Sequence, residues 1–366
     1  MTFERKNIRD MVGYIPGEQP EFSEVIKLNT NENPFAPSPA VKKALSGINT
    51  DKLRRYPQST ANDLRDSISK HHDVEKDNIL VTNGGDELLR LAISTFVETD
   101  EAIAVAEPTY TLYKVLAQVH GCRYIRFSLN EDWSLPENFA KSLNNSNVKM
   151  CLLPNPNAPS GTLIPFKELA TLASKFNGIL LIDEAYVDFI DPSLDHDCIK
   201  LIKQFDNILL LRTFSKGYSL AGLRIAYGIG NLSLINPMQS KTKDSYNTDY
   251  IAQKLAQAAL EDQDYARKTW AFVRLQKAIL KDALTDLGLY SVDSQSNFLL
   301  VSVPKLLNAE KLYTGLKKRG ILVRHFKDAD LTSSCLQENF LRITIGKTDE
   351  NQLLLSTLKL LTAKDN

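Results

Sequence analysis

The stretch Asn207–Gly228 reads NILLLRTFSKGYSLAGLRIAYG and lies near the middle of the chain. Ile208–Leu211 is a continuous apolar run, which predicts a strand that is buried on both faces. Lys216 follows in the loop beyond this strand. Lysine normally keeps its amine in water, and a buried amine more readily becomes the neutral nucleophile that forms Schiff bases. The needs of folding therefore do not explain why a lysine stands just after a buried strand. The simple alternative is that Lys216 lies in a surface loop with its amine in water.

Short apolar runs alternate with helical periodicity on both sides of this stretch. Strands are expected at Ile79–Thr82, Ala102–Ala106, Tyr124–Phe127, Val148–Leu153 and Ile179–Ile182. Among them, helices are expected at Leu88–Val97, Tyr110–Val119 and Phe166–Phe176. This alternation predicts an α/β fold with a mostly parallel sheet flanked by helices. Ligands of such sheets bind outside the carboxyl ends of the strands.

The character of the chain changes after Gly230. Tyr250–Leu287 has helical spacing throughout, which predicts one long helix connecting two lobes, and the segments after it alternate as in a smaller α+β domain. We expect an N-terminal arm at residues 1–37 that is part of the small domain. We expect a large domain at 38–247, and the interdomain helix with the small C-terminal domain at 248–366.

Composition narrows the functional classes. The hydrophobic content of 43% and the charged content of 24% are those of a soluble globular protein. Lys+Arg 44 balances Asp+Glu 44, so no global basic field favours nucleic acid or a membrane surface. The cysteines and histidines show no metal-ligand spacing, so we expect no metal, and free thiols in a reducing cytoplasm.

Several polar residues stand at expected strand ends. Gly85 and Asp86 open a helix after a strand, which suits an anion or a plain turn. Ser215 and Arg224 also suit a phosphate, and a lysine beside phosphate ligands suggests pyridoxal phosphate. Asp183 ends a buried run, where it either caps a helix or pairs with a cationic ring nitrogen.

The S-K-x-x-x-x-x-G-L-R run from Ser215 to Arg224 resembles the lysine segment of fold-type-I, pyridoxal-phosphate-dependent aminotransferases, most closely the histidinol-phosphate aminotransferases. The resemblance extends from Tyr14 to Arg342 and includes YxPG, LNxNENP and R-Y-P. It implies that Lys216, Asp183 and Tyr186 are catalytic. It further implies cofactor contacts from Gly85, Asp86, Tyr110, Asn157, Asp183, Tyr186, Thr213, Ser215, Lys216 and Arg224, and from Tyr56 across a homodimer interface.

The same resemblance implies substrate contacts from Tyr14, Asn157, Arg324 and Arg342. The family commonly has asparagine as its ring-oxygen ligand directly before the proline of Asn-Asn-Pro-Thr-Gly, but Ala158 fills that position here. The role is therefore assigned to Asn157, with Asn155 as the fallback. Ala158-Pro159 is also a candidate cis peptide bond.

The implied reaction is transamination between L-histidinol phosphate and 2-oxoglutarate in histidine biosynthesis. Threonine-phosphate decarboxylase and aromatic amino acid aminotransferase share the motifs and remain alternatives on the same scaffold. A non-enzymatic regulator on this scaffold would be expected to carry an added nucleic-acid-binding domain and a basic excess, and neither is evident in the sequence.

Overall fold

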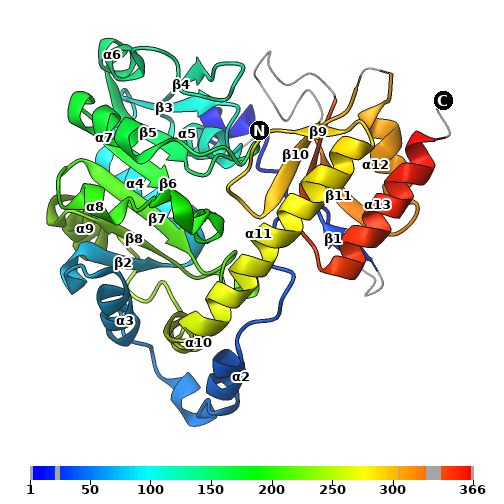
Figure 1. Cartoon of the computed structure of the whole chain (residues 1–366). Helices are drawn as coiled ribbons and strands as arrows, with labels where there is room; N and C mark the ends of the chain where they lie inside the picture. Colours follow the sequence, from blue (N-terminus) through cyan, green and yellow to red (C-terminus); the bar gives the residue numbers. More distant parts are fainter. Residues whose placement is uncertain (1–2, 21–24, 305, 327–338, 364–366) are drawn as a thin grey trace.

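The computed structural model describes residues 3–20, 25–304, 306–326 and 339–363, which form two sheets with helices packed around them (Figure 1). The larger sheet has seven strands in the order β2-β8-β7-β6-β5-β3-β4. Its strands are β2 (Ile79–Thr82), β3 (Ala102–Glu107), β4 (Arg123–Ser128), β5 (Val148–Pro154), β6 (Ile179–Asp183), β7 (Ile208–Thr213) and β8 (Ala226–Gly230).

Six of these strands run parallel to one another. β8 alone pairs antiparallel with both of its neighbours, β7 and β2. The carboxyl ends of β2, β3, β5, β6 and β7 therefore lie along one edge of the sheet, and the residues preceding β8 return to that same edge. The predicted α/β architecture is confirmed.

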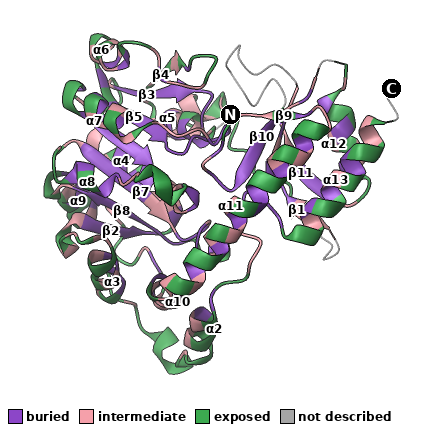
Figure 2. Ribbon diagram, in the orientation of Figure 1, coloured by how far each residue is buried: buried purple, intermediate pink, exposed green. Residues whose placement is uncertain are grey.

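Side chains alternate between two apolar layers, one on each face of this sheet. In β3, for example, Ala104 and Ala106 belong to one buried cluster, whereas Ile103 and Val105 belong to the other. Burial on both faces explains why the inner strands read as continuous apolar runs, whereas the edge strand β4 is partly exposed and mixed in composition (Figure 2). One layer is completed by α3 (Asn62–His72), α6 (Phe139–Asn145), α7 (Phe166–Lys175), α8 (Ile199–Ile202) and α10 (Tyr250–Glu261), and the other by α4 (Gly84–Phe96), α5 (Leu112–His120) and α9 (Leu232–Pro237).

The second sheet combines the two ends of the chain. Its strand order is β1-β11-β12-β10-β9, and β1 (Ile26–Leu28) pairs parallel with β11 (Ile321–His325). The other strands are β9 (Tyr290–Ser291), β10 (Phe298–Ser302) and β12 (Phe340–Thr344), and the helices packed on them are α11 (Gln263–Asp286), α12 (Ala309–Lys317) and α13 (Thr348–Thr362). The N-terminal segment is thereby fixed to the C-terminal sheet. Short helices α1 (Lys6–Arg9) and α2 (Pro39–Ser46) flank β1 in sequence.

The prediction of one continuous helix over Tyr250–Leu287 is wrong. Two helices, α10 and α11, meet at Asp262, whose backbone leaves the helical conformation and whose side chain accepts a hydrogen bond from the Tyr265 amide. Aspartate competes for local backbone amides, so it can start a new helix inside a periodic pattern. Apolar periodicity continues through such a break, which is why it was missed.

Two smaller expectations have clear outcomes. The Ala158–Pro159 peptide bond is cis, as expected. Cys122, Cys151 and Cys198 are free thiols, whereas Cys335 lies outside the described residues. Within the described part of the chain, no helix is both long and apolar enough to cross a bilayer.

Candidate active site

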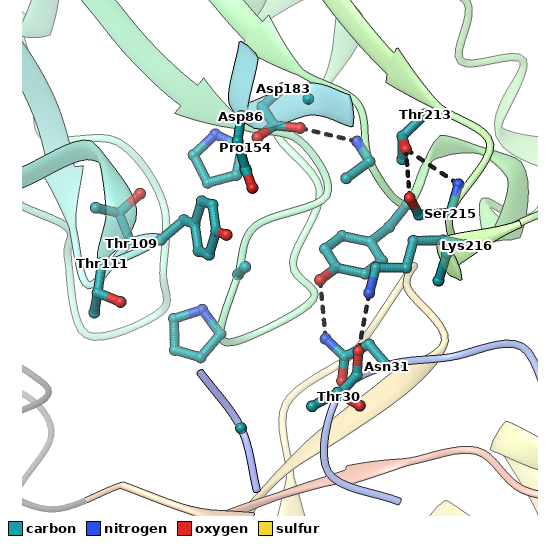
Figure 3. Close-up of a pocket in the computed structure, with 18 of the residues that line it drawn as sticks. Thr30, Asn31, Asp86, Thr109, Thr111, Pro154, Asp183, Thr213, Ser215 and Lys216 are labelled. Atoms are coloured by element: carbon teal, nitrogen blue, oxygen red, sulfur yellow. Dashed lines mark hydrogen bonds between the residues drawn. The ribbon is translucent and has the colours of Figure 1, made fainter. Parts of the chain in front are cut away.

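A cavity of about 240 Å³ opens at the carboxyl edge of the large sheet and faces the small one. The structure brings most of the predicted site residues to its wall (Figure 3). The predicted residues that line it are Tyr14, Gly85, Asp86, Tyr110, Asp183, Tyr186, Thr213, Ser215, Lys216, Arg224, Arg324 and Arg342. They come from segments up to 328 positions apart in the sequence, counted from Tyr14 to Arg342.

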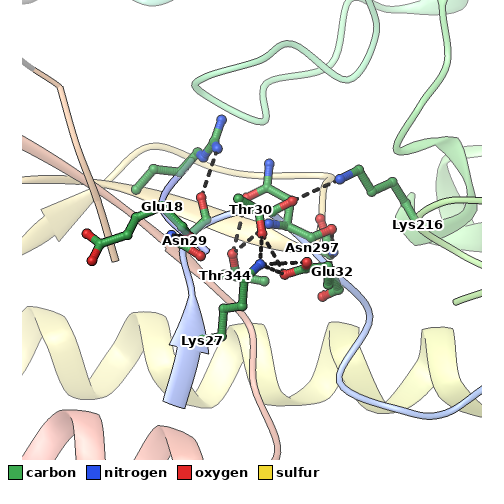
Figure 4. A network of polar contacts seen from close by, with 10 residues as sticks. Glu18, Lys27, Asn29, Thr30, Glu32, Lys216, Asn297 and Thr344 are labelled. Carbon is green, nitrogen blue, oxygen red and sulfur yellow. Dashed lines mark hydrogen bonds and ion pairs between the residues drawn. The ribbon is translucent and has the colours of Figure 1, made fainter. Parts of the chain in front are cut away.

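Lys216 follows β7 and directs its amine into this cavity. Nζ donates a hydrogen bond of 2.9 Å to the backbone carbonyl of Thr30, in the segment after β1 (Figure 4). Burial lowers the pKa of Lys216 to about 8, and the positive charge of Arg342 contributes to the same shift. Roughly a tenth of this amine is therefore neutral, and nucleophilic, at pH 7, far more than for a lysine in water.

Asp183 ends β6 and is 7% exposed. Its carboxylate accepts hydrogen bonds from the Tyr113 hydroxyl at 2.9 Å and from the Ala185 amide at 3.1 Å. Burial raises the pKa of Asp183 to about 6, although both hydrogen bonds oppose that shift. A cation in the cavity would stabilise the charged carboxylate, and a protonated ring nitrogen is a cation of the required shape.

An anion cradle lies at the N-terminus of α4. Gly84 has φ of +76°, and a Cβ there would meet the Arg224 guanidinium at 2.8 Å, so only glycine lets the arginine lie this close to the helix end. Arg224 also forms an ion pair with Asp86 at 3.3 Å. Thr213 donates to the Ser215 hydroxyl at 3.0 Å, which leaves the Ser215 proton available to a ligand. Helix amides, a hydroxyl and a guanidinium together suit a phosphate.

Two arginines of the small sheet and two tyrosines also line the cavity. Arg342 lies over the Phe298 ring, and one of its amino groups donates to the Asn29 carbonyl at 3.4 Å. Its Nε is buried without a hydrogen-bond partner among the described residues, so it has a donor to spare for an anion. Arg324 pairs in register with Arg342 on adjacent strands. The Tyr14 ring meets the edge of Tyr110 at 5.8 Å between centroids.

Two predicted site residues do not line the cavity. Asn157 is buried, but its side chain donates to the Pro108 carbonyl and accepts from Ser160, so it shapes the loop. Asn155, the fallback, is likewise engaged with the Ile164 backbone. Tyr56 is 80% exposed and stacks on Tyr246, with 4.4 Å between centroids. Contact of these residues with a ligand stays a prediction.

Sequence inspection missed three contributors to the site. Tyr113 lies one helical turn after Tyr110 and is fully buried, a spacing that could have suggested a second inward aromatic. Thr30 contributes through its carbonyl, for which no sequence signal exists. Asn31 donates to the Tyr186 hydroxyl at 2.9 Å. Asn31 belongs to the motif Leu28–Pro34, but its partner lies 155 positions away.

A buried polar cluster lies behind the cavity wall. Potential ligand atoms of Glu184, His196 and Cys198 lie within 4.8 Å of one another, although no metal ligation was expected from their spacing. The Cys198 thiol lies 3.3 Å from His196 Nε2, and Glu184 binds the Arg212 guanidinium at 2.7 Å. These contacts and the adjacent cationic Arg212 engage all three side chains of the cluster. We therefore interpret the cluster as a hydrogen-bonded network that stabilises the end of β6.

The fold and this set of groups define the class of pyridoxal-phosphate-dependent aminotransferases, and comparison with known proteins agrees with that class. Residues 23–358 match the model of aminotransferase class I and II, and the chain belongs to that family. It is 40% identical, over 97% of either chain, to "Histidinol-phosphate aminotransferase 1" of Trichormus variabilis.

Solved structures show the same fold. Histidinol-phosphate aminotransferase from Sinorhizobium meliloti, in complex with pyridoxal-5'-phosphate, aligns with a TM-score of 0.88 at 23% identity, covering 100% of this chain and 98% of that one. L-threonine-O-3-phosphate decarboxylase from Porphyromonas gingivalis aligns with a TM-score of 0.77 at 23% identity, covering 92% and 99%. Fold similarity of this kind does not discriminate between the two reactions.

Proposed function

We propose that the protein uses pyridoxal phosphate to transfer the amino group of L-histidinol phosphate to 2-oxoglutarate, giving imidazole acetol phosphate and glutamate in histidine biosynthesis. The observation that carries this proposal is the convergence of Lys216, Asp183 and the anion cradle on one cavity. The 40% identity to a curated aminotransferase of that name supports the choice of substrate.

The residues present fit the cofactor. The amine of Lys216 would hold it, Asp183 would pair with its ring nitrogen, and the amides of Gly85 and Asp86 with Ser215 and Arg224 would bind its phosphate. The close approach of Arg224 to Gly84 brings a guanidinium to the start of α4, where the first amides of the helix lie. When bound there, pyridoxal phosphate supplies an aldehyde for amine exchange and a ring that withdraws electrons from the substrate carbon.

The chain's own groups would handle the proton and orient the substrate. Lys216 Nζ, whose pKa is near 8, accepts the proton from the substrate α-carbon and returns it. The Thr30 carbonyl holds that amine toward the cavity. Arg342, with its unengaged Nε, and Arg324 bind the anionic end of each substrate. The ring of Tyr110 would stack on the cofactor ring, and Tyr14 lines the cavity beside Tyr110.

We also propose a homodimer in which Tyr56 reaches the cofactor phosphate of the other subunit. Tyr56 is highly exposed and is absent from the cavity of its own chain, so a role at the site requires a second copy. The compartment we propose is the cytoplasm, where free thiols persist; Cys122, Cys151 and Cys198 are free in the structure.

A substrate panel tests the reaction. Purified protein loaded with pyridoxal phosphate is assayed with histidinol phosphate, phenylalanine and threonine phosphate, each with 2-oxoglutarate. We expect the highest kcat/KM with histidinol phosphate and no CO₂ release from threonine phosphate. Lys216→Ala should lower kcat by at least about 10³-fold through loss of the general base. Lys277→Met, which changes another buried lysine outside the cavity, is the matched control. Normal turnover by Lys216→Ala would refute the assignment.

A further inference from the structure

The Tyr186 hydroxyl has a single hydrogen bond among the described residues. Tyr186 is 9% exposed and lines the cavity beside Asp183 and Lys216. Its oxygen lies 2.9 Å from Nδ2 of Asn31, which is 1% exposed (Figure 3). An amide nitrogen can only donate, so the tyrosine oxygen is the acceptor and its own proton is uncommitted.

Thr344 fixes the direction of this hydrogen bond. The Asn31 backbone amide donates to the Thr344 hydroxyl at 3.0 Å, and that hydroxyl donates to Asn31 Oδ1 at 3.2 Å. Among the described residues, Asn31 Oδ1 is the acceptor that the structure gives to the Thr344 hydroxyl proton, and a flipped amide would leave that proton without one. The amide oxygen of Asn31 therefore faces Thr344, and its NH₂ group faces Tyr186. Asn297 also donates to the Asn31 carbonyl at 3.0 Å, so both the backbone and the side chain of Asn31 are held in place (Figure 4).

We propose that Asn31, oriented by Thr344, is a positioning residue that makes the Tyr186 hydroxyl a hydrogen-bond donor into the cavity, toward the oxyanion of the cofactor ring. The inference rests on the proposed function, because it requires a ring that carries such an oxygen. In this proposal the small sheet orients a group of the large domain. Thr344 in β12 and Asn31 after β1 set the direction of the hydroxyl proton of Tyr186, which follows β6.

The surroundings of Tyr186 agree with a donor role. Burial raises the pKa of Tyr186, so its proton stays in place, whereas Arg342 and the hydrogen bond from Asn31 lower it and make the hydroxyl a stronger donor. The backbone also favours asparagine here. Asn31 has φ of 58°, a left-handed conformation that asparagine, aspartate and glycine adopt more readily than other residues.

Two substitutions at Asn31 distinguish removal of its amide donor from replacement of that donor by an acceptor. Asn31→Gly keeps the positive φ and removes the amide. Asn31→Asp keeps the shape but offers an acceptor, which would draw the Tyr186 proton away from the cavity. The readout is the pH titration of the visible absorbance of the bound cofactor. Weaker hydrogen-bond donation from the Tyr186 hydroxyl destabilises the oxyanion of the cofactor ring. The proton whose release changes the absorbance is then held more tightly, because the oxyanion carries more of the negative charge that attracts it. We expect the apparent pKa of that absorbance to rise by roughly one unit in Asn31→Gly, and at least as much in Asn31→Asp.

The decisive comparison repeats Asn31→Gly in a protein that already carries Tyr186→Phe. If Asn31 acts through Tyr186, then Asn31→Gly produces no further shift once the hydroxyl is absent. Thr344→Val is the second variant, should the glycine variant not fold, and we expect a smaller shift of the same sign. Asn351→Ala removes another buried amide near the small sheet and should lower stability without moving the titration.

Two results would overturn the inference: an unchanged titration in Asn31→Gly or Thr344→Val, or an equal Asn31→Gly shift in the presence and absence of the Tyr186 hydroxyl. Failure of the proposed function is distinguishable from both, since the wild-type protein would then develop no visible absorbance with pyridoxal phosphate.

Discussion

Lys216 is a base whose strength is set by the groups that enclose it. Its side chain is half-buried, has the Thr30 carbonyl as a hydrogen-bond partner and shares the cavity with Arg342. Burial and neighbouring positive charge both favour the neutral amine, and the Glu32 carboxylate opposes them only partly. Burial would raise the pKa of Glu32, but hydrogen bonds from Lys27 and Thr30 hold it below its usual range. Glu32 therefore stays charged, but the positive charge of its ion-pair partner Lys27 lowers the pKa of Lys216 and offsets part of the Glu32 effect.

The lowered pKa of Lys216 predicts a pH-dependent cost to folding. In the folded protein Lys216 releases its proton near pH 8, whereas in the unfolded chain it does so near 10.5. Between these values the unfolded state binds more protons, so the free energy of unfolding rises with pH. Cofactor-free Lys216→Met should be more stable than wild type at pH 7, by on the order of 2 kcal/mol, with the difference shrinking toward pH 10. Urea unfolding at several pH values measures this, and a pH-independent difference would contradict it.

The charged residues that follow buried apolar strands could be predicted from the sequence as site residues. Lys216 and Asp183 each follow a buried apolar run, where a charged group requires an explanation. The carbonyl of Thr30 and the amide of Asn31 were not predictable, because their roles depend on β1 joining β11 and bringing the N-terminal segment to the cavity. Sequence patterns encode which face a residue occupies but not which distant partner it meets.

At the scale of elements, the antiparallel strand β8 decides where Arg224 lies. Because β8 reverses direction between β7 and β2, the loop that carries Lys216 and Arg224 stays at the carboxyl edge. The sequence indicated the strands in the right order, since the inner strands of the large sheet are covered on both faces and read as apolar runs. It did not indicate α6, which lies between β4 and β5. It did not reveal the break at Asp262, because the apolar stripe continues across α10 and α11 while only one side chain marks the new helix.

The ends of β6 and β7 are joined by a buried ion pair whose disruption should be costly. Glu184 follows β6 and has no exposed side-chain surface, and Arg212 lies in β7 with 13% exposure. Arg212→Met alone would leave a buried carboxylate unpaired and should destabilise the protein by about 3–5 kcal/mol. Adding Glu184→Gln removes that charge and should restore part of the loss. Chemical denaturation of the single and double variants tests this, and simple additivity would count against it.

At the scale of the whole molecule, the cavity lies between two sheets that are built from interleaved parts of the chain. The N-terminal β1 belongs to the small sheet, yet the segment after it supplies Thr30 and Asn31 to a site whose other groups follow β6 and β7. Movement of one sheet relative to the other would therefore alter both the Lys216 and the Tyr186 hydrogen bonds. Tyr56 lies outside this arrangement, exposed and stacked on Tyr246, and a single chain gives it no access to the cavity.

A complementation experiment decides whether Tyr56 acts across a dimer interface. Tyr56→Ala and Lys216→Ala chains, each with a different affinity tag, are co-expressed, and the mixed dimer is isolated with both tags. If Tyr56 serves the partner's cavity, one site of the mixed dimer combines an intact Lys216 with an intact Tyr56. In that case the Tyr56→Ala homodimer is itself impaired at both sites, and the mixed dimer should recover about half the wild-type activity, since one of its two sites is complete. If Tyr56 acts within its own chain or not at all, no site regains a missing group, and the mixed dimer will not exceed half the activity of the Tyr56→Ala homodimer.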